Sequence, residues 1–422
     1  MLTRLLAGRR KINRVLLRGS PKVASICYTP AKSVVHIQVA DALLRRYVMQ
    51  EKAKKNQDRP AHSKRALRSR REHHNGFLFP EMSENPWLTA RRKGNDSKTK
   101  VGTRGGLTTL ELCAGAGGQA LGFEQAGIEH AGLVELDPNA CATLRLNRPA
   151  WSVIEEDLNS FDGSSFKGVD ILSGGLPCPP FSIAGKQLGT KDERNLFPAM
   201  IRLVDQVRPR AVMIENVRGI LEAVFEDYRH HIATQLKKLG YQTGWKLLNA
   251  SDFGVPQLRP RVIFIGLKKE YSEHFSWPTG SGSPPITVGE TLCDLMESRG
   301  WRGAKAWRER ANEIAPTIVG GSKKHGGPDL GPTRARQAWA SLGVDGLGIA
   351  DEPPSREFVG MPRLTVRMAA RVQGFPDEWQ FFGRKTAVYR QVGNAFPPPF
   401  AKAVGESVKA SLSASRMVRV AG

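Results

Sequence analysis

The sequence predicts an α/β fold, with a doubly wound, mostly parallel sheet in one large domain and a smaller, loop-rich second domain. Strand-length apolar runs alternate with helix-length segments from Leu107 onward, which is the pattern of a parallel sheet covered by helices. A glycine-rich turn follows the first apolar run directly. The chain has 422 residues, of which 40% are hydrophobic, so it is long enough for both domains.

The elements of this sheet can be placed along the chain. The first strand is expected at 107–112, and its turn, Cys113 to Gly118, leads into a helix that ends near Gln125, as in Rossmann-like domains. Further strands are expected at 131–135, 170–173, 211–214 and 261–267, and helices at 138–146 and 196–207. After 268 the sequence becomes rich in Gly, Pro and Ser, which indicates the second domain. Residues 389–412 predict a loop and a final helix.

The charge is unevenly distributed. Residues 1–106 carry 25 Lys or Arg against 7 Asp or Glu, a net charge of +18, which leaves +5 of the total +23 for residues 107–422. A surplus of this sign favours a polyanionic partner such as nucleic acid, although composition alone does not separate DNA from RNA or a membrane surface. We expect residues 1–104 to be a basic, poorly ordered extension.

Five widely spaced cysteines contain no Cys-x-x-Cys pair. This spacing argues against a disulfide framework and against a zinc cluster, so no metal is expected. A reducing cytoplasm is the simplest location for such a chain. No run approaches the roughly 18 apolar residues of a membrane helix, so no membrane partner is expected.

A glycine turn and two acidic residues follow the first strand in order. The glycine turn lets backbone amides approach an anionic or carboxylate-bearing ligand; a dinucleotide, or no ligand, remains an alternative at this point. Glu135, about 20 residues further on, suits a ribose diol, and Asp157 could accept from an adenine amino group. Each acid alone would more often be a helix cap or a solvated charge. Together they favour an adenosine cofactor.

The strand expected at 170–173 leads into Ser173-Gly-Gly-Leu-Pro-Cys178-Pro-Pro-Phe-Ser182. A cysteine within a strand would usually be an inert small hydrophobe, but Cys178 lies between prolines on a glycine-rich turn at the ligand edge of the sheet. That context favours an exposed nucleophile. The next strand ends in Glu215-Asn-Val, which could otherwise be a capping pair.

These strings, with three later ones, resemble the motifs of the bacterial cytosine-C5 DNA methyltransferases, in the family's order, from Leu107 to Val408. The strings are Leu112 to Gly118, Pro177-Cys178, Glu215-Asn-Val217, Gln257-Leu-Arg259-Pro-Arg261, Arg363-Leu-Thr365 through Gln373-Gly-Phe-Pro376, and Gln391-Val-Gly-Asn394. Cys113-Ala114 stands where many members carry Phe-Ser, so aromatic packing against the cofactor is either missing or supplied elsewhere.

The resemblance implies an S-adenosylmethionine-dependent DNA (cytosine-5)-methyltransferase. Cys178 matches the thiol that adds to C6 of cytosine, and Glu215 matches the acid that binds N3 and the exocyclic amine. Arg259 and Arg261 match the active-site arginines, which can orient Glu215 and the base or a phosphate. The expected cofactor contacts are Cys113, Ala114, Gly115, Gly117, Gly118, Glu135, Leu136, Asp157, Leu158 and Asn394.

The resemblance also implies a division of the chain and a DNA partner. We expect a catalytic domain at 105–267, a target-recognition domain at 268–376, and a segment at 377–422 that returns to the catalytic domain beside the glycine turn. The target base must be flipped out of the duplex, under a lid expected at 182–195. The candidate DNA contacts are Lys186, Arg194, Lys323, Lys324, Arg334 and Arg336, although solvated basic loops would have the same composition.

The enzyme is expected to be a monomer in the cytoplasm, associated with the nucleoid, and paired with a restriction endonuclease that acts on the same site. Two alternatives remain at this point. An RNA-directed relative would use the same fold, and a catalytically dead scaffold would bind DNA without modifying it. The size of the variable domain favours duplex DNA, and the presence of the catalytic residue types together argues against the dead scaffold.

Overall fold

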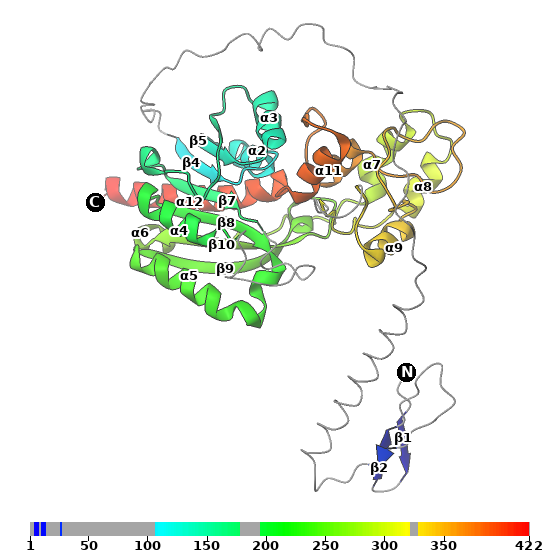
Figure 1. Ribbon diagram of the computed structural model, residues 1–422, viewed down its shortest axis with the longest axis horizontal. Coiled ribbons are helices and arrows are strands. Elements are labelled where there is room, and N and C mark those ends of the chain that lie inside the picture. The colour runs from blue at the N-terminus through cyan, green and yellow to red at the C-terminus, as the bar shows by residue number, and fades with distance from the viewer. Residues whose placement is uncertain are drawn as a thin grey trace, which may run out of the picture. The chain divides into compact units, whose positions relative to one another are not determined.

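The computed structural model describes residues 106–177, 195–320 and 328–421, together with three short strands near the N-terminus (Figure 1). The chain divides into two units, Met1–Asp96 and Ser97–Gly422. In the first unit, β2 (Arg10–Asn13) pairs antiparallel with both β1 (Arg4–Ala7) and β3 (Ile26–Cys27). The second unit contains the sheet and every other element described below.

A seven-stranded sheet forms the centre of the second unit, in the order β6-β5-β4-β7-β8-β10-β9. Its strands are β4 (Leu107–Leu112), β5 (Ile128–Glu135), β6 (Val153–Glu155), β7 (Ile171–Gly175), β8 (Ala211–Val217), β9 (Tyr241–Asn249) and β10 (Pro260–Lys268). β10 alone runs in the direction opposite to the other six strands, so its pairings with β8 and β9 are antiparallel. The five expected strands are confirmed, while the sequence prediction missed β6 and β9, the two edge strands.

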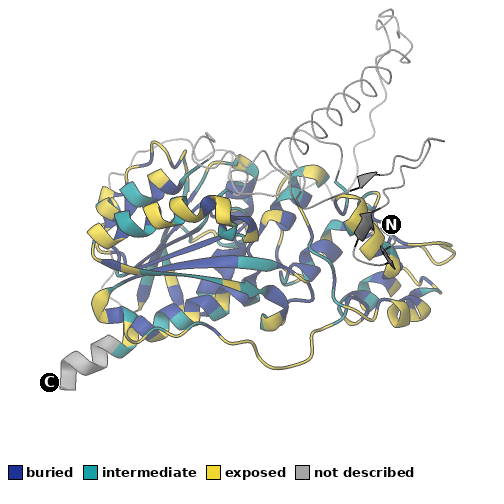
Figure 2. Cartoon of the chain, turned by 90° about the horizontal axis from the view of Figure 1, so that it is seen from below, coloured by how far each residue is buried: buried dark blue, intermediate teal, exposed yellow. Residues whose placement is uncertain are grey.

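Helices cover both faces of this sheet. On one face lie α4 (Phe197–Val207) and α5 (Glu226–Lys238), and on the other lie α2 (Gly118–Gln125), α6 (Lys269–Ser272) and α12 (Pro398–Ala421). The strands alternate accordingly: Val212 and Ile214 pack towards α4, whereas Ala211 and Met213 pack towards α12. Figure 2 shows the buried strands between helices whose outer sides are exposed. The result is the three-layer arrangement of a doubly wound domain.

The strand order reverses between β4 and β7. From β4 the chain moves outward through β5 and β6, crosses back, and continues on the other side through β7 and β8. Ligands of doubly wound sheets bind at such a reversal, outside the carboxyl ends of the strands. The glycine turn after β4 and the segment after β7 flank this point, so the sequence motifs at 113–118 and 173–177 meet at one edge.

The last helix, α12, packs against α2, the helix that follows the glycine turn. A Cβ atom on Gly122 would lie 2.5 Å from the carbonyl oxygen of Pro398 and 2.6 Å from the Cβ of Ala401. A Cβ on Gly118 would lie 2.3 Å from the carbonyl oxygen of Phe396. Glycine is therefore needed at both positions, because the backbones of α2 and the start of α12 touch. The expected packing of the last helix beside the glycine turn is present.

A second group of helices forms its own core. They are α7 (Val288–Glu297), α8 (Ala304–Arg310), α9 (Thr333–Ser341), α10 (Val366–Val372) and α11 (Lys385–Asn394). The core is centred on buried tryptophans and aliphatic side chains of these helices and their loops. α3 (Pro138–Asn147) flanks β5 and β6. The division into domains at 268 and 376 stays a prediction. Helices α10 and α11, which lie on opposite sides of the boundary at 376, share one core.

Candidate active site

The glycine turn after β4 has a left-handed backbone. Cys113, Gly115 and Gly117 have φ angles of 53°, 55° and 83°, a region that glycine enters readily and cysteine rarely. The amide of Ala114 donates to the Val134 carbonyl (3.1 Å), and the amide of Gly117 donates to the Ala114 carbonyl (3.1 Å). The turn is thereby tied to β5, and the N-terminus of α2 faces the ligand edge, where it favours a negatively charged group.

Glu135, at the end of β5, is held by three backbone amides. Its carboxylate accepts from the amides of Gly115 (2.7 Å), Leu136 (2.9 Å) and Asp137 (2.7 Å). A carboxylate has about four lone-pair positions, so one acceptor position is left for a hydroxyl group of a ligand. This geometry suits the expected contact with a ribose diol.

The other expected cofactor residues occupy different environments. Leu136 is 61% exposed beside Glu135, which is unusual for a leucine next to a buried strand end. Asp157 is exposed and accepts from the amide of Asn159 (2.9 Å), while Leu158 is buried in the core on the α4 face. Asn394 is exposed at the end of α11, just before the Phe396 carbonyl that touches α2.

Two aromatic side chains that the sequence analysis did not single out support the turn. The indole Nε1 of Trp379 donates to the Ala116 carbonyl (3.1 Å). A Cβ on Gly117 would lie 2.9 Å from the Trp379 ring, and one on Gly118 would lie 3.2 Å from the Phe375 ring. Both rings are buried. The 375–379 segment therefore packs two aromatic rings against the backbone of the glycine turn.

Burial raises the pKa of the Cys113 thiol far above its ordinary value, and the nearby charges of Glu135 and Asp157 add to the effect. A thiol that stays protonated is a poor nucleophile. Cys113 is therefore not a competitor for the nucleophilic role that the sequence assigns to Cys178.

A buried ion pair lies at the end of β8, next to β7. The Arg261 Nε donates to the Glu215 carboxylate at 2.7 Å, and the two side chains are only 12% and 7% exposed. The other carboxylate oxygen faces Gly175, where an added Cβ would lie 3.4 Å away. Asn216 reaches from β8 to the Leu176 carbonyl (3.4 Å). Glu215 is thus fixed in orientation, and Asn216 braces the chain two residues before Cys178.

Arg259 lies deeper than Arg261. It is 1% exposed, and its guanidinium donates to the carbonyls of Ile318 (2.7 Å), Gly393 (2.8 Å) and Ala395 (3.1 Å). The observed orientation of Glu215 comes from Arg261, and the contacts of Arg259 join distant segments of backbone instead. A catalytic role of Arg259 stays a prediction.

Several sequence predictions fall outside the described residues. They concern the nucleophile Cys178 and the DNA contacts Lys186, Arg194, Lys323 and Lys324. Of the remaining DNA contacts, Arg334 is exposed on α9, while Arg336 packs against Gly346 and donates to Thr333 (3.4 Å). Arg334 is therefore the better placed of these two to meet a phosphate.

A buried polar cluster lies beneath the glycine turn. Glu111 on β4 is 1% exposed, and its Oε2 lies 3.9 Å from the Nδ1 of His130 on β5. Within the described part of the chain, neither of these two atoms has a hydrogen-bond partner. Burial raises the pKa of Glu111 to about 8 and lowers that of His130 to about 4. Both groups are therefore neutral near pH 7.

This cluster makes stability depend on pH in a predictable way. Glu111 keeps its proton up to about pH 8 in the folded state but ionises near 4.5 when unfolded, so its contribution to stability falls as pH rises between these values. His130 acts in the opposite sense between about 4 and 6.5. The interval from pH 6.5 to 8 therefore isolates Glu111.

The free energy of unfolding of the parent should fall by up to about 2 kcal/mol between pH 6.5 and 8, and this fall should be absent in Glu111→Gln. Urea unfolding of the parent and the variant at several pH values in this interval measures the difference. Glu129→Gln, which removes an exposed carboxylate one residue before His130, serves as the control and should follow the parent. Equal slopes for Glu111→Gln and the parent would show that Glu111 is ionised in the folded state.

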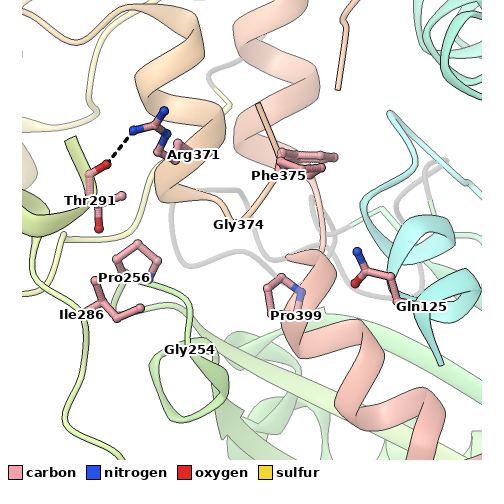
Figure 3. A pocket seen from close by; sticks show the side chains of 10 residues that line it. Gln125, Gly254, Pro256, Ile286, Thr291, Arg371, Gly374, Phe375 and Pro399 are labelled. Atoms are coloured by element: carbon pink, nitrogen blue, oxygen red, sulfur yellow. Dashed lines mark hydrogen bonds between the residues drawn. The ribbon is translucent and has the colours of Figure 1, made fainter. Parts of the chain in front are cut away.

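A cavity of about 330 Å³ opens at the end of α2 that lies opposite the glycine turn (Figure 3). Three prolines, Ile286 and Phe375 form much of its wall. Arg371, the one ionisable side chain among its ten lining residues, donates to the Thr291 carbonyl (3.1 Å) and pairs with Asp294 and Asp377. The cavity thus has no unengaged acid or base for catalysis, and the chemistry is expected at the strand ends.

Comparison with known proteins identifies the family of this chain. The model of the C-5 cytosine-specific DNA methylase family matches residues 107–410. The Type II methyltransferase M.NgoMIV of Neisseria gonorrhoeae is 56% identical over 305 residues, covering 72% of this chain and 97% of that relative. The Type II methyltransferase M.NaeI of Lentzea aerocolonigenes is 55% identical over 313 residues, covering 73% and 76%.

A solved structure shares the fold. The crystal structure of a prophage-encoded Escherichia coli protein, assigned as a DNA modification methyltransferase, superimposes with a TM-score of 0.51 at 23% identity, covering 73% of this chain and 99% of that one. Sheet order, glycine turn and strand-end acids thus define a Rossmann-like methyltransferase fold.

The chain belongs to the C-5 cytosine-specific DNA methylase family. It is an enzyme that methylates cytosine at C5 in DNA, and the predicted fold class and enzyme class are confirmed. Among the helices that the structure describes, none is both long and apolar enough to cross a membrane.

Proposed function

We propose that the enzyme transfers a methyl group from S-adenosylmethionine to C5 of a cytosine flipped out of a specific duplex sequence, through covalent addition of Cys178 to C6. The observation that carries this proposal is the buried Glu215–Arg261 ion pair between β8 and β10. Glu215 lies beside β7, the strand that leads into Cys178, and only β7 separates β8 from β4, the strand before the glycine turn.

The residues of the ligand edge fit S-adenosylmethionine. The remaining acceptor position of Glu135 suits a ribose hydroxyl, the exposed Leu136 offers an apolar surface to an adenine ring, and Asp157 can accept from its amino group. The N-terminus of α2 suits the carboxylate of the methionine portion. When bound, the cofactor supplies an electrophilic methyl group on sulfur.

The chain's own residues prepare the base. C5 of cytosine is a weak nucleophile, and addition of the Cys178 thiolate to C6 raises the electron density at C5 so that it can accept the methyl group. Glu215 hydrogen-bonds N3 and the exocyclic amine, which promotes the addition and selects cytosine. Loss of the C5 proton then lets the thiolate leave and restores the aromatic ring. Arg261 holds Glu215 in place through these steps.

The substrate is proposed to be a short duplex site. C5 and C6 are stacked inside a duplex, so the base must leave the helix at a cost of a few kcal/mol. Recognition of the surrounding sequence is assigned to the helices from α7 to α10 and their loops, with Arg334 and the lysines at 323 and 324 as contacts to phosphates or base edges.

The biological setting is proposed from the relatives. Two of them, at 56% and 55% identity, are named Type II methyltransferases, which supports a modification enzyme that protects sites from a cognate endonuclease without forming a stable complex with it. We further propose that it acts as a monomer on chromosomal DNA.

One experiment tests substrate and product together. Bisulfite sequencing of DNA from cells that express the gene should show 5-methylcytosine at one short sequence, absent from cells without it, and tRNA should stay unmodified. Purified enzyme should form a covalent adduct on duplexes with 5-fluorocytosine at that site, because fluorine cannot leave as the C5 proton does. Modified tRNA with unmodified DNA would reject the proposed substrate, and absence of an adduct would reject the addition to C6.

A further inference from the structure

The first two polar residues of the Gln257-Leu-Arg259-Pro-Arg261 string lie at a buried junction of four chain segments. Gln257 is 0% exposed; its side chain accepts from the Ile318 amide (2.9 Å) and donates to the Gln373 side chain (2.8 Å). Gln373 in turn donates to the Ala395 carbonyl (2.6 Å). Together with Arg259, these contacts join residues 256–259 to 315–318, to the end of α10 and to the end of α11.

Arg259 brings a positive charge to this junction, at a place where the structure stabilises a cation. Two of its acceptors, the carbonyls of Gly393 and Ala395, lie at the C-terminus of α11, where the helix dipole favours a cation. The third acceptor, the Ile318 carbonyl, belongs to the segment that enters residues 319–320. A single guanidinium therefore binds α11 and the 315–318 segment at once, through the fork of donors that arginine alone provides.

The backbones that Arg259 holds touch each other. A Cβ on Gly393 would lie 2.4 Å from the Gly320 amide nitrogen, and a Cβ on Gly320 would lie 2.4 Å from the Asn394 side-chain oxygen. Further along, the Tyr389 hydroxyl of α11 donates to the Asp329 carbonyl (2.9 Å). Helix α11 thus fixes the chain both at 318–320 and at 329, between α8 and α9, in the region to which DNA recognition is assigned.

We propose that Arg259 is a positioning residue for target recognition, and that with Gln257 it sets the place of the 315–320 backbone against the end of α11. This rests on the proposed function, because it assumes that the smaller group of helices reads DNA. Arg261, two residues further on, serves the chemistry. Within this short string, Arg261 therefore serves the reaction and Arg259 serves recognition of the DNA sequence.

The test measures two quantities in Arg259→Lys and Gly320→Ala: the preference for the target site over an altered site, and the rate of methyl transfer. The lysine keeps the charge but cannot bind three carbonyls in the same way, and the alanine displaces the same backbone without touching Arg259. The substrates are duplexes with the mapped target site and duplexes with one altered base pair outside the target cytosine. We expect both variants to show a KM for DNA about tenfold higher and a discrimination about tenfold weaker. The single-turnover rate should stay within about threefold of the parent when DNA and S-adenosylmethionine are both saturating, because a weaker cofactor contact of Asn394, which lies beside Gly320, then no longer limits the rate.

Two controls separate positioning from loss of stability. Arg229→Met removes another arginine that donates to backbone carbonyls, those of Ile220 and Glu222, and Gly106→Ala adds a methyl group where the nearest atom is 3.5 Å away. Both should retain the discrimination of the parent, even where the melting temperature falls.

The outcomes distinguish this inference from the proposed function. A lower single-turnover rate with unchanged KM and discrimination would make Arg259 a catalytic residue and overturn the inference. Equal loss of discrimination in Arg229→Met would also overturn it. If Arg259→Lys does not fold, Gly320→Ala decides alone. Failure of the proposed function would appear earlier, as a parent enzyme that does not methylate DNA.

Discussion

Replacement of Cys178 by alanine is expected to lower the rate of methyl transfer by roughly 10⁴-fold or more, because the residual rate of enzymes that lose their nucleophile comes from binding alone. We expect the variant to fold, because the preceding strand β7 is held by its pairing with β4 and β8, and the Leu176 carbonyl accepts from Asn216. Transfer of a radioactive methyl group to duplex DNA measures the rate, and calorimetric titration with S-adenosylhomocysteine measures cofactor binding.

Cys293→Ala is a suitable control for this experiment. Its thiol is partly buried on α7, away from the strand ends, so the variant should methylate DNA like the parent. Methylation by Cys178→Ala at a rate near that of the parent would remove covalent addition from the mechanism. A loss of cofactor binding along with activity would instead make Cys178 part of the cofactor site.

A second large effect on activity is expected for variants of the Glu215–Arg261 ion pair. Glu215→Gln should lower kcat by about 10²- to 10⁴-fold, because an amide cannot supply a proton to N3 in the way a carboxyl group can. Arg261→Met should also lower kcat, and it should lower the free energy of unfolding by about 3 kcal/mol or more, since it leaves a buried carboxylate without its cation. Steady-state kinetics and urea unfolding measure the two quantities on the same samples.

The double variant separates structure from chemistry. Combining Glu215→Gln with Arg261→Met removes both charges, so much of the lost stability should return while activity stays low. The exposed pair Arg145–Glu155, whose side chains are 48% and 40% exposed, provides the comparison, and Arg145→Met should cost less than about 1 kcal/mol. A double variant that regains activity with its stability would show that the pair only supports the fold.

The fold could be predicted from the sequence largely because the central strands are apolar and alternate with helices. The edge strands β6 and β9 were missed for a physical reason. A strand with only one neighbour is partly exposed, so its sequence mixes polar with apolar residues, as in Tyr241–Asn249. The reversed direction of β10 was equally hidden, because side-chain patterning does not report strand direction.

The candidate site was less accessible to sequence reasoning. Local motifs indicated Glu135, whose partners are amides of the glycine turn and of the two residues after it, and also Glu215 and Arg261, which pair from neighbouring strands. The support from Trp379 and Phe375, and the neutral pair of Glu111 and His130, depend on contacts between segments far apart in the chain. Spacing cannot reveal such contacts. The burial of Arg259 belongs to the same class, since alternate arginines at the start of a strand would ordinarily be solvated.

The contact between the first and the last helix of the large domain has a consequence for how the protein is made. Helix α2 leaves the ribosome about 280 residues before α12. Until α12 is synthesised, the apolar side of α2 around Phe123 stays exposed to solvent. Domains fold as units during synthesis, so this one cannot finish folding before α12 has left the ribosome. The nascent chain should therefore acquire its activity only after α12 is released, and a chain truncated before Pro398 should aggregate.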